Sequence, residues 1–249
     1  MKQRVMVTLW RDEKADLPGY SGNVYDEQWV ANLARNVKRQ LPNGELVVVA
    51  DTFYCRRLIE AGEQNLPELK EVQIVPMLGV GIGGWSNVFE LWRPELWPEE
   101  GARHLAVGLD TVFVGDPSWL FRWDEGHVGV PFDPYHHPEV CDAVISFDKA
   151  GAAMLWNEFL HSKGDGMKQD HYMGRPSEMA LIRRMHRERG APWVAALELM
   201  PERLLSYKCH VKTGEVPVQS TTSVVYFHGT PKPHQLGTDD PIRKEWEAP

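Results

Sequence analysis

A histidine, a glycine and a lysine follow an apolar stretch in the segment VVYFHGTPKPH (224–234). His228 ends the apolar stretch, and Gly229 has no side chain, so the backbone there can approach a ligand closely. Lys232 stands between two prolines, which stiffen the loop and fix the direction of its ammonium group. A histidine that can bind a metal, beside a lysine that can bind phosphate, favours a metal–diphosphate ligand. The alternative is a proline-rich turn with a surface lysine.

A second candidate is the carboxylate of Asp110, inside the apolar segment HLAVGLDTVFVG (104–115). An ionised carboxylate in a buried strand is costly unless it is paired or bound to a cation. We therefore expect a functional role for Asp110. Asp116, which follows the same segment, is expected to cap the turn that begins at Pro117.

A glycine-rich segment, GVGIGGW (79–85), has the dinucleotide-binding spacing GxGxxG at Gly79, Gly81 and Gly84. The match is weak because it comes late in the chain and the helix after it soon meets Pro94. A flexible loop beside a substrate is the simpler interpretation, and a nicotinamide-dependent oxidoreductase is the alternative. Trp10 and Trp85 are the best placed of the ten tryptophans to stack on a base or a sugar.

Several other kinds of site are disfavoured by the sequence. It contains neither a GxSxG elbow nor a GxxxxGK[ST] loop, and His136 and His137 stand outside any zinc framework. The three cysteines are far apart, which is typical of reduced thiols, and no apolar run reaches the roughly 18 residues of a membrane span. We therefore expect a cytoplasmic protein.

Strand-like and helix-like segments alternate along the chain, and these elements must position the candidates. Short apolar stretches predict strands over 5–10, 45–51, 72–78, 104–115, 142–147 and 223–229. Amphipathic stretches predict helices over about 26–40, 54–63, 85–92, 149–161 and 177–189. The alternation predicts an α/β fold with a mostly parallel central sheet flanked by helices. Ligands gather at the carboxyl ends of such strands, where Trp10, Asp51, Asp110 and His228 are expected.

The composition is that of an ordinary globular protein, with 43% apolar and 25% charged residues among 249. We expect a single domain over 1–249, with a polar, proline-rich and loosely ordered tail over 235–249. The net charge of -8 disfavours broad, nonspecific binding of nucleic acid, although it does not exclude a local basic patch.

Read in order, these segments resemble nucleotide-sugar-dependent glycosyltransferases of the GT-A fold, related to the bacterial and phage members of glycosyltransferase family 8. The resemblance covers most of the chain. It rests most firmly on the two end segments and is supported by the ones between them: VYDEQWV (24–30), VVVADTF (47–53), GGWSNVFELW (83–92), GLDTVFVG (108–115), KQDHY (168–172), SYK (206–208) and FHGTPKP (227–233).

The resemblance implies transfer of a glycosyl group, hexosyl or pentosyl, from a nucleotide diphosphate sugar to a hydroxyl, with a UDP-sugar as the expected donor. The half over about 1–105 would bind the nucleotide, and the half over about 106–234 would bind the metal and the acceptor. The implied donor-binding residues are Thr8, Trp10, Tyr25, Asp51, Trp85, Asn87, Gly229 and Lys232. Asp51 would read a uracil base, and its alternative role is to cap the helix that starts near Thr52.

The resemblance also implies a divalent cation, Mn²⁺ or Mg²⁺, held by Asp110 and His228. Asp170 and Gln169 would lie near the transferred sugar, and Lys232 would stabilise the departing diphosphate. Two departures stand out. Gly108 replaces the first aspartate of the usual Asp-x-Asp pair, and Asn87 stands where a lysine is usual. A non-catalytic relative that binds nucleotide sugars is therefore the alternative function.

The acceptor is expected to be either a saccharide hydroxyl or a hydroxymethylated pyrimidine in DNA. Basic residues on the predicted helix over 177–189 offer a face for a polyanion: Arg183, Arg184, Arg187 and Arg189, with His186 among them. The alternative is a solvated helix face whose arginines pair with nearby acidic residues. A lipid-linked acceptor is not favoured, because the sequence shows no membrane anchor.

Overall fold

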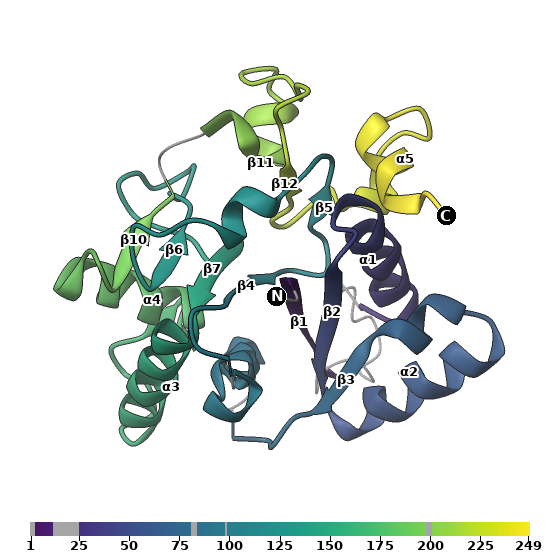
Figure 1. Cartoon of the computed structure of the whole chain (residues 1–249). Helices are drawn as coiled ribbons and strands as arrows, with labels where there is room; N and C mark the ends of the chain where they lie inside the picture. The colour runs from purple at the N-terminus through teal and green to yellow at the C-terminus, as the bar shows by residue number, and fades with distance from the viewer. Residues whose placement is uncertain (1–2, 12–24, 81–83, 98, 198–200) are drawn as a thin grey trace.

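The computed structural model describes residues 3–11, 25–80, 84–97, 99–197 and 201–249, with the backbone alone at Gly84, Trp85 and Pro201. Seven strands form a central sheet in the order β10-β6-β7-β4-β1-β2-β3 (Figure 1). Along the chain they are β1 (Gln3–Leu9), β2 (Gly44–Ala50), β3 (Gln73–Pro76), β4 (Arg103–Val107), β6 (Val128–Val130), β7 (Val144–Asp148) and β10 (Val194–Ala196). Neighbouring strands are parallel except where β7 pairs with β4 and β6. The predicted α/β fold with a mostly parallel sheet is confirmed.

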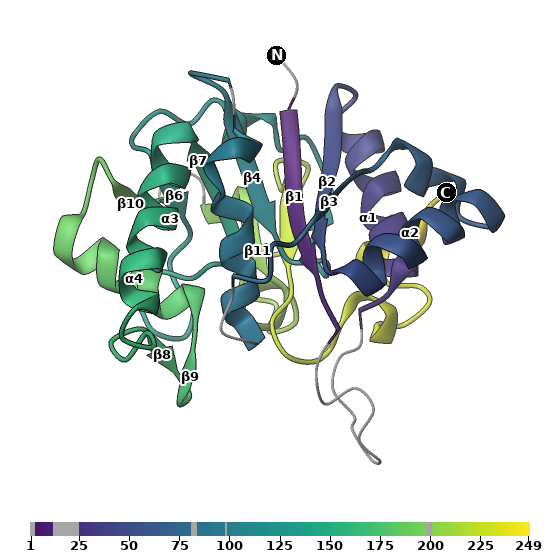
Figure 2. The same cartoon turned by 90° about the horizontal axis from the view of Figure 1, so that it is seen from below.

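Helices pack on both faces of this sheet because its buried strands alternate their side chains between the faces. Val5 and Val7 of β1 pack with α1 (Glu27–Gln40) and α2 (Thr52–Gln64). Met6 points to the other face, which is covered by the 3₁₀-helix η2 (Gly84–Trp92), α3 (Lys149–Lys163) and α4 (Glu178–Arg189). Figure 2 shows α1 and α2 on one side of the molecule and α3 and α4 on the other.

Helix α1 begins where the sequence predicts. Asp26 accepts hydrogen bonds from the backbone N–H groups of Gln28 and Trp29, at 3.0 and 3.3 Å, which satisfies donors that have no partner inside the helix. The helix expected over 85–92 is a 3₁₀-helix instead of an α-helix. The described chain contains no helix with the length and apolar composition needed to cross a bilayer.

The long strand expected over 104–115 is wrong. The chain leaves the central sheet after β4, turns with a hydrogen bond from the Thr111 N–H to the Gly108 carbonyl (3.0 Å), and re-enters a second sheet as β5 (Val112–Phe113). This smaller sheet has the order β11-β12-β5, with β11 (Leu204–Ser206) and β12 (Val224–Tyr226). The segment expected as a strand over 223–229 therefore supplies β12 of the small sheet.

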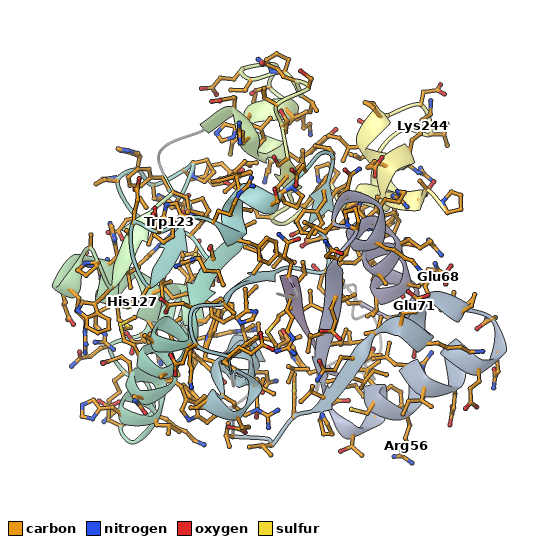
Figure 3. All side chains as sticks on the ribbon, in the orientation of Figure 1. Arg56, Glu68, Glu71, Trp123, His127 and Lys244 are labelled. Atoms are coloured by element: carbon orange, nitrogen blue, oxygen red, sulfur yellow. The ribbon has the colours of Figure 1, made fainter. Side chains whose placement is uncertain are left out.

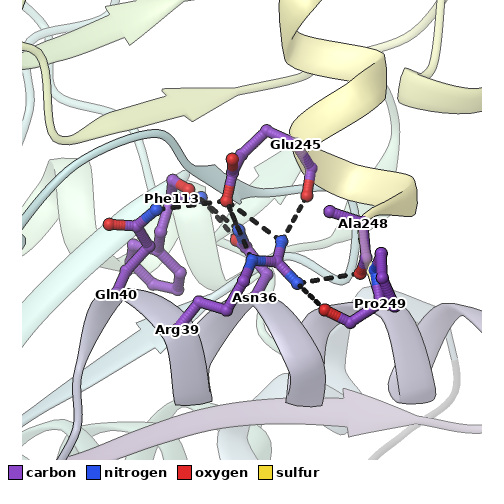
Figure 4. A network of polar contacts seen from close by, with 7 residues as sticks. All are labelled: Asn36, Arg39, Gln40, Phe113, Glu245, Ala248 and Pro249. Carbon is purple, nitrogen blue, oxygen red and sulfur yellow. Dashed lines mark hydrogen bonds and ion pairs between the residues drawn. The ribbon is translucent and has the colours of Figure 1, made fainter.

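The tail is not loosely ordered, because its last helix, α5 (Pro241–Glu247), docks against α1 and the small sheet. Ile242 and Trp246 are buried there. Figure 4 shows the polar side of the contact, where the Arg39 guanidinium donates to the Glu245 carboxylate (3.0 Å) and to the Ala248 carbonyl (2.8 Å). Burial of these apolar side chains and the charge-assisted hydrogen bonds stabilise the docked helix, although the segment is rich in polar residues.

Shorter elements connect the larger ones. They are the 3₁₀-helices η1 (Pro67–Glu71), η3 (Pro94–Leu96), η4 (Ser118–Phe121), η5 (Pro201–Arg203) and η7 (Pro233–Gln235), the π-helical turn η6 (Tyr207–Val211), and the two-stranded ribbon of β8 (His171–Tyr172) and β9 (Arg175–Pro176). His228 contacts Ser206 and Cys209 at the start of η6, and η7 begins directly after Lys232, so both elements help to hold this segment in place.

Candidate functional site

A cavity of about 570 Å³ lies at the edge of the central sheet where β1 and β4 end. Its walls come from segments far apart in the chain, because the carboxyl ends of parallel strands meet at one edge. The lining residues include Thr8, Trp10, Tyr25, Tyr54, Gly108, Asp110, Asp142, Glu178, His228, Gly229 and Lys232. The structure thus brings the first and last segments singled out in the sequence to one place.

Lys232 and Asp110 form a buried ion pair in this cavity, with exposed fractions of 4% and 5%. Tyr25 joins them, because its hydroxyl donates to Oδ2 of Asp110 (3.1 Å) and accepts from Nζ of Lys232 (3.0 Å). Burial, and then the charge of Asp110, raise the pKa of Tyr25 far above its usual value. The phenol therefore stays neutral and orients the ion pair.

The loop that carries Lys232 is held at several points. Gly229 has a φ of 65°, in the left-handed region where a side chain would be strained. The Lys232 N–H donates to Oε1 of Gln235 (2.8 Å), which ties the loop to the start of η7. These constraints aim the ammonium group into the cavity and limit the entropy that ordering it costs on ligand binding.

His228 is half-buried beside the same cavity. Its Nε2 lies 2.9 Å from the Ser206 hydroxyl and 3.9 Å from Sγ of Cys209. Burial, followed by the positive charge of Lys208, lowers the pKa of His228. The imidazole is therefore neutral at pH 7 and engages its neighbour by a hydrogen bond.

Asp110 and His228, as arranged, do not fit a divalent cation. The Asp110 carboxylate is already paired with the Lys232 ammonium and the Tyr25 hydroxyl. A Cβ added to Gly108 would lie 2.6 Å from Oδ1 of Asp110, so that carboxylate occupies the space of the missing aspartate side chain. Within the described ranges, no three His, Cys, Asp or Glu side chains converge to hold a metal.

Some of the other predicted donor-binding residues line the cavity, and others lie outside it. Thr8, Trp10 and Tyr25 line the cavity. Asp51 caps α2 instead, accepting from the backbone N–H groups of Tyr54 (2.8 Å) and Arg11 (2.7 Å). Asn87 is half-buried on η2 and is not among the lining residues. The Trp85 side chain lies outside the described part of the chain.

The structure does not bring Asp170 and Gln169 to the cavity. Asp170 is fully buried, and its two carboxylate oxygens accept hydrogen bonds from the Arg184 guanidinium at 2.7 and 3.0 Å. The Ser162 hydroxyl also donates to it. Gln169 is exposed in the loop between α3 and β8. This ion pair joins that loop to α4, which accounts for the buried charge of Asp170 without a ligand.

Two acidic residues that the sequence reasoning did not single out, Asp142 and Glu178, line the cavity. Asp142 precedes β7, and Glu178 is the first residue of α4. Ligand-binding residues are expected at the ends of parallel strands, whereas Asp142 stands just before the start of β7. Because β7 runs antiparallel to β4, with Val144 opposite Val107, its beginning lies at the ligand-binding edge. In the sequence, only the position of Asp142 directly before an apolar stretch could have indicated it as a site residue.

The arginines of α4 are paired with carboxylates. Arg183 pairs with Asp133, and Arg184 pairs with Asp170 and Glu158. Arg187 and Arg189 each lie 2.9 Å from a carboxylate oxygen, of Glu139 and Glu158 respectively. The helix face is therefore largely neutralised, which agrees with the solvated alternative and gives no support to a polyanion site.

The glycine-rich segment is only partly described, since 81–83 lie outside the described residues. The Leu78 and Val80 N–H groups donate to the buried Glu90 carboxylate, at 3.1 and 2.9 Å. Those amides are thus engaged within the protein, and η2 is not the α-helix that follows a dinucleotide-binding loop.

A second hollow, of about 410 Å³, includes His127 and Trp123, both labelled in Figure 3. Nδ1 of His127 lies 2.8 Å from Oδ2 of Asp148. The other oxygen of Asp148 accepts from the Gly151 N–H (2.8 Å) and caps α3. The Arg103 guanidinium lies 4.8 Å from the centre of the Trp123 ring. These contacts are explained by the local structure, and we assign no function to this hollow.

No protein-family model matches the chain, and no curated protein sequence matches it. Solved structures do. The glycosyltransferase GlyE of Streptococcus pneumoniae TIGR4 has a TM-score of 0.60 at 12% identity, over 99% of this chain. The galactosyltransferase LgtC, in complex with donor and acceptor sugar analogues, has a TM-score of 0.54 at 10% identity, covering 93% of this chain and 89% of LgtC.

Mouse xyloside xylosyltransferase 1 gives a TM-score of 0.54 at 12% identity, covering 92% of this chain and 98% of that enzyme. The present chain spans 59% of the length of GlyE. At these identities the likeness concerns the fold, and the chain has the GT-A fold of these glycosyltransferases.

Proposed function

We propose that this protein transfers a glycosyl group from a nucleotide diphosphate sugar to a hydroxyl group. The observation that carries the proposal is the buried Lys232 ammonium in a cavity of about 570 Å³, at the ligand-binding edge of a GT-A fold. A cation so placed suits the diphosphate of a nucleotide sugar, which gains negative charge as the bond to the sugar breaks.

In the proposed reaction, the bond between the anomeric carbon and the diphosphate oxygen breaks, and a bond to the acceptor oxygen forms. Lys232 and the Gly229 N–H stabilise the departing diphosphate, and the proton of the acceptor hydroxyl passes to an oxygen of that diphosphate. Asp110 and Tyr25 position Lys232 through their hydrogen bonds to it. The fixed positive charge supplies stabilisation that in other phosphate sites comes from a metal ion.

The proposed donor is a UDP-sugar. Support comes from the aromatic side chains of Trp10 and Tyr25 in the cavity wall, because an aromatic ring offers a stacking surface for a nucleobase. Both residues belong to the half over about 1–105 that we propose binds the nucleotide, whereas Lys232 belongs to the half over about 106–234. The Asp51 carboxylate accepts hydrogen bonds from two backbone N–H groups, so it is not part of the proposed base-binding site.

The proposed acceptor is a saccharide or small-molecule hydroxyl. The competing acceptor, a hydroxymethylated pyrimidine in DNA, loses its main support because the α4 arginines are paired with carboxylates. A non-catalytic role in binding nucleotide sugars is the second candidate, and the specific observation that favours it is Gly108 in place of the usual aspartate.

The deciding experiment is calorimetric titration of the protein with UDP, UDP-glucose, UDP-galactose and UDP-xylose, and with NADH as the comparison ligand. Each titration is run with EDTA and again with Mn²⁺. We expect UDP-sugars to bind, NADH not to bind, and the affinity to be similar in both conditions. Binding of NADH alone would contradict the proposal. A tenfold or greater gain with Mn²⁺ would restore Asp110 and His228 as metal ligands.

Release of UDP is then measured with and without candidate saccharides. Acceptor-dependent release indicates transfer and identifies a hexosyl or pentosyl donor. Donor binding with neither transfer nor hydrolysis would indicate the non-catalytic alternative.

A further inference from the structure

Gly108 stands where the chain leaves the central sheet, and its missing side chain leaves room for another group. It lines the cavity, and its carbonyl accepts from the Thr111 N–H (3.0 Å) in the turn after β4. Its φ is not positive, in contrast to that of Gly229, so the backbone does not itself require glycine there. The three heavy atoms nearest to a Cβ added at Gly108 all belong to the side chains of Asp110 and Thr111. The neighbouring side chains therefore favour glycine at this position.

The group that takes this room is the Asp110 carboxylate. Its Oδ1 would lie 2.6 Å from the added Cβ, so a side chain at position 108 requires the carboxylate to move. Its Oδ2 accepts from the Tyr25 hydroxyl (3.1 Å) and from the Lys232 ammonium group. The Tyr25 carbonyl in turn accepts from the Tyr54 hydroxyl (2.9 Å), which holds Tyr25 in place. Asp110 thus reaches Lys232 in a position that a side chain at 108 would block.

The same carboxylate decides the charge of this part of the cavity wall. The buried Asp110 carboxylate and Lys232 ammonium group neutralise each other without an ion from solution. A second carboxylate at position 108 would displace that of Asp110 and add a negative charge to the wall that His228 also lines. Two carboxylates and an imidazole are a ligand set that binds divalent cations. Glycine at 108 removes both the second carboxylate ligand and the negative charge that would attract the cation.

The structure assigns Gly108 as the residue that makes this site independent of a divalent cation, because it lets Asp110 pair with Lys232. This inference deepens the proposed function and rests on it for the identity of the ligand, a diphosphate. The Lys232 ammonium group, held by Asp110 and Tyr25, then provides the positive charge that a metal ion provides in a site with two aspartates. Exclusion of the cation is a property of the protein without nucleotide, and so it can be measured separately.

The first measurement is Mn²⁺ binding without nucleotide, followed by the electron paramagnetic resonance signal of free Mn²⁺. Gly108→Asp adds a carboxylate, and Gly108→Ala fills the same space without adding a ligand. Gly237→Asp is the matched control, because it adds the same charge at an exposed glycine with no heavy atom within 4 Å of the added Cβ. We expect Gly108→Asp to bind Mn²⁺ at least about tenfold more tightly than the wild type, and neither of the other variants to gain affinity.

The second measurement is titration with UDP, in EDTA and again with Mn²⁺. The wild type should bind UDP equally in both conditions, within about twofold, whereas Gly108→Asp should bind it at least about tenfold more tightly with Mn²⁺. Circular dichroism and thermal unfolding check that each variant is folded. If Gly108→Asp does not fold, Gly108→Asn takes its place. It adds a ligand oxygen without a second charge, and should give a smaller gain with Mn²⁺ where Gly108→Ala gives none.

Two results would overturn the inference while leaving the proposed function intact. One is a gain of about tenfold or more in the UDP affinity of the wild type with Mn²⁺, because Asp110 would then bind the metal despite Gly108. The other is a folded Gly108→Asp variant, or Gly108→Asn in its place, that binds Mn²⁺ no better than Gly108→Ala. If the wild type binds neither UDP nor any UDP-sugar in either condition, the proposed function is refuted, and the Mn²⁺ measurement still decides whether Gly108 excludes the cation.

Discussion

Lys232 brings a positive charge into a site where its side chain is 5% exposed, and the Asp110 carboxylate compensates that charge. Desolvating two such groups costs more than an isolated surface pair gains, so the pair is weak evidence for a purely stabilising role. Its position in the cavity and its hydrogen bonds to Tyr25 favour a role in ligand binding instead.

The first prediction concerns this charge. Lys232→Met should lower turnover by about 10², because a fixed cation no longer stabilises the departing diphosphate. The substitution also leaves Asp110 unpaired and buried, which alone is destabilising. The double variant Lys232→Met with Asp110→Asn removes both charges and should fold better while remaining as slow. Steady-state kinetics measures the effect, and Lys70→Ala, at an exposed position, is the control. Near wild-type turnover in the folded double variant would contradict the role of Lys232.

His104 gives the second prediction, which concerns pH. Its side chain is 1% exposed, both ring nitrogens lack partners among the described residues, and burial lowers the pKa to about 4. The positive charges of Arg4 and Arg103 act in the same direction. In the unfolded chain the pKa returns to about 6.5, so the unfolded state binds the proton first as the pH falls.

Stability supported by neutral His104 is therefore complete above about pH 6.5 and declines until about pH 4, by roughly 3 kcal/mol at most. His104→Phe keeps a ring against Trp97 and Phe147 and removes the titration. Urea unfolding at several pH values between 4 and 7 measures the free energy of unfolding. The wild type should lose more stability than the variant, and identical slopes would contradict the prediction.

At the scale of elements, two departures from regular alternation shape the cavity. The turn at Gly108–Thr111 ends β4 and sends the chain into the small sheet, which leaves Asp110 at the cavity wall. The antiparallel β7 then brings Asp142 to the same edge. The turn and the antiparallel strand thus each place an acidic side chain, Asp110 and Asp142, at the cavity wall.

Helix α5 supports the small sheet, and the third prediction concerns its docking. Trp246 is 5% exposed and packs against Trp29, with ring centres 5.1 Å apart. Trp246→Ala should lower the free energy of unfolding by about 3 kcal/mol, because it removes a large buried side chain and leaves a cavity. Trp193→Ala, at a position 39% exposed, should cost less than about 1 kcal/mol. Urea unfolding compares the two, and equal losses would contradict the docking of α5 by Trp246.

At the scale of the whole molecule, distant parts of the chain meet in one cavity while the outer face of α4 is occupied by ion pairs. The net charge of -8 adds a general repulsion for polyanions. The fold forms the cavity at the edge of the sheet. The side chains that line it include Asp110 and Lys232, with Gly108 in place of the first aspartate of the usual Asp-x-Asp pair.

The fourth prediction follows from this charge distribution. Given a bound UDP-sugar, we expect transfer to saccharides but no hexose-mass shift on DNA containing 5-hydroxymethylcytosine or 5-hydroxymethyluracil. Mass analysis of digested nucleosides measures the DNA arm. A shift that weakens with added salt, and with Arg183 and Arg187 changed to alanine, would instead indicate a DNA acceptor.

The sequence alone was sufficient for the first strands and the main helices, and for the end segments of the cavity. Helix α1 buries Trp29, Val30, Leu33 and Val37 as its spacing predicts, because a periodic apolar stripe must find a core. Lys232 was identified from the pattern of its loop and Tyr25 from the family resemblance, and the two lie together in the structure. Local periodicity and loop chemistry are properties of neighbouring residues, and so they can be read along the chain.

The partner of each polar group was decided by the tertiary structure. Asp110 meets Lys232, Asp170 meets Arg184, and Asp142 meets Glu178, across separations that no local pattern encodes. The family resemblance implied that Asp170 lies near the transferred sugar, whereas the fold pairs its carboxylate with the Arg184 guanidinium. Whether a carboxylate binds a cation, a guanidinium or a second carboxyl group depends on which side chain the fold brings within about 3 Å of it.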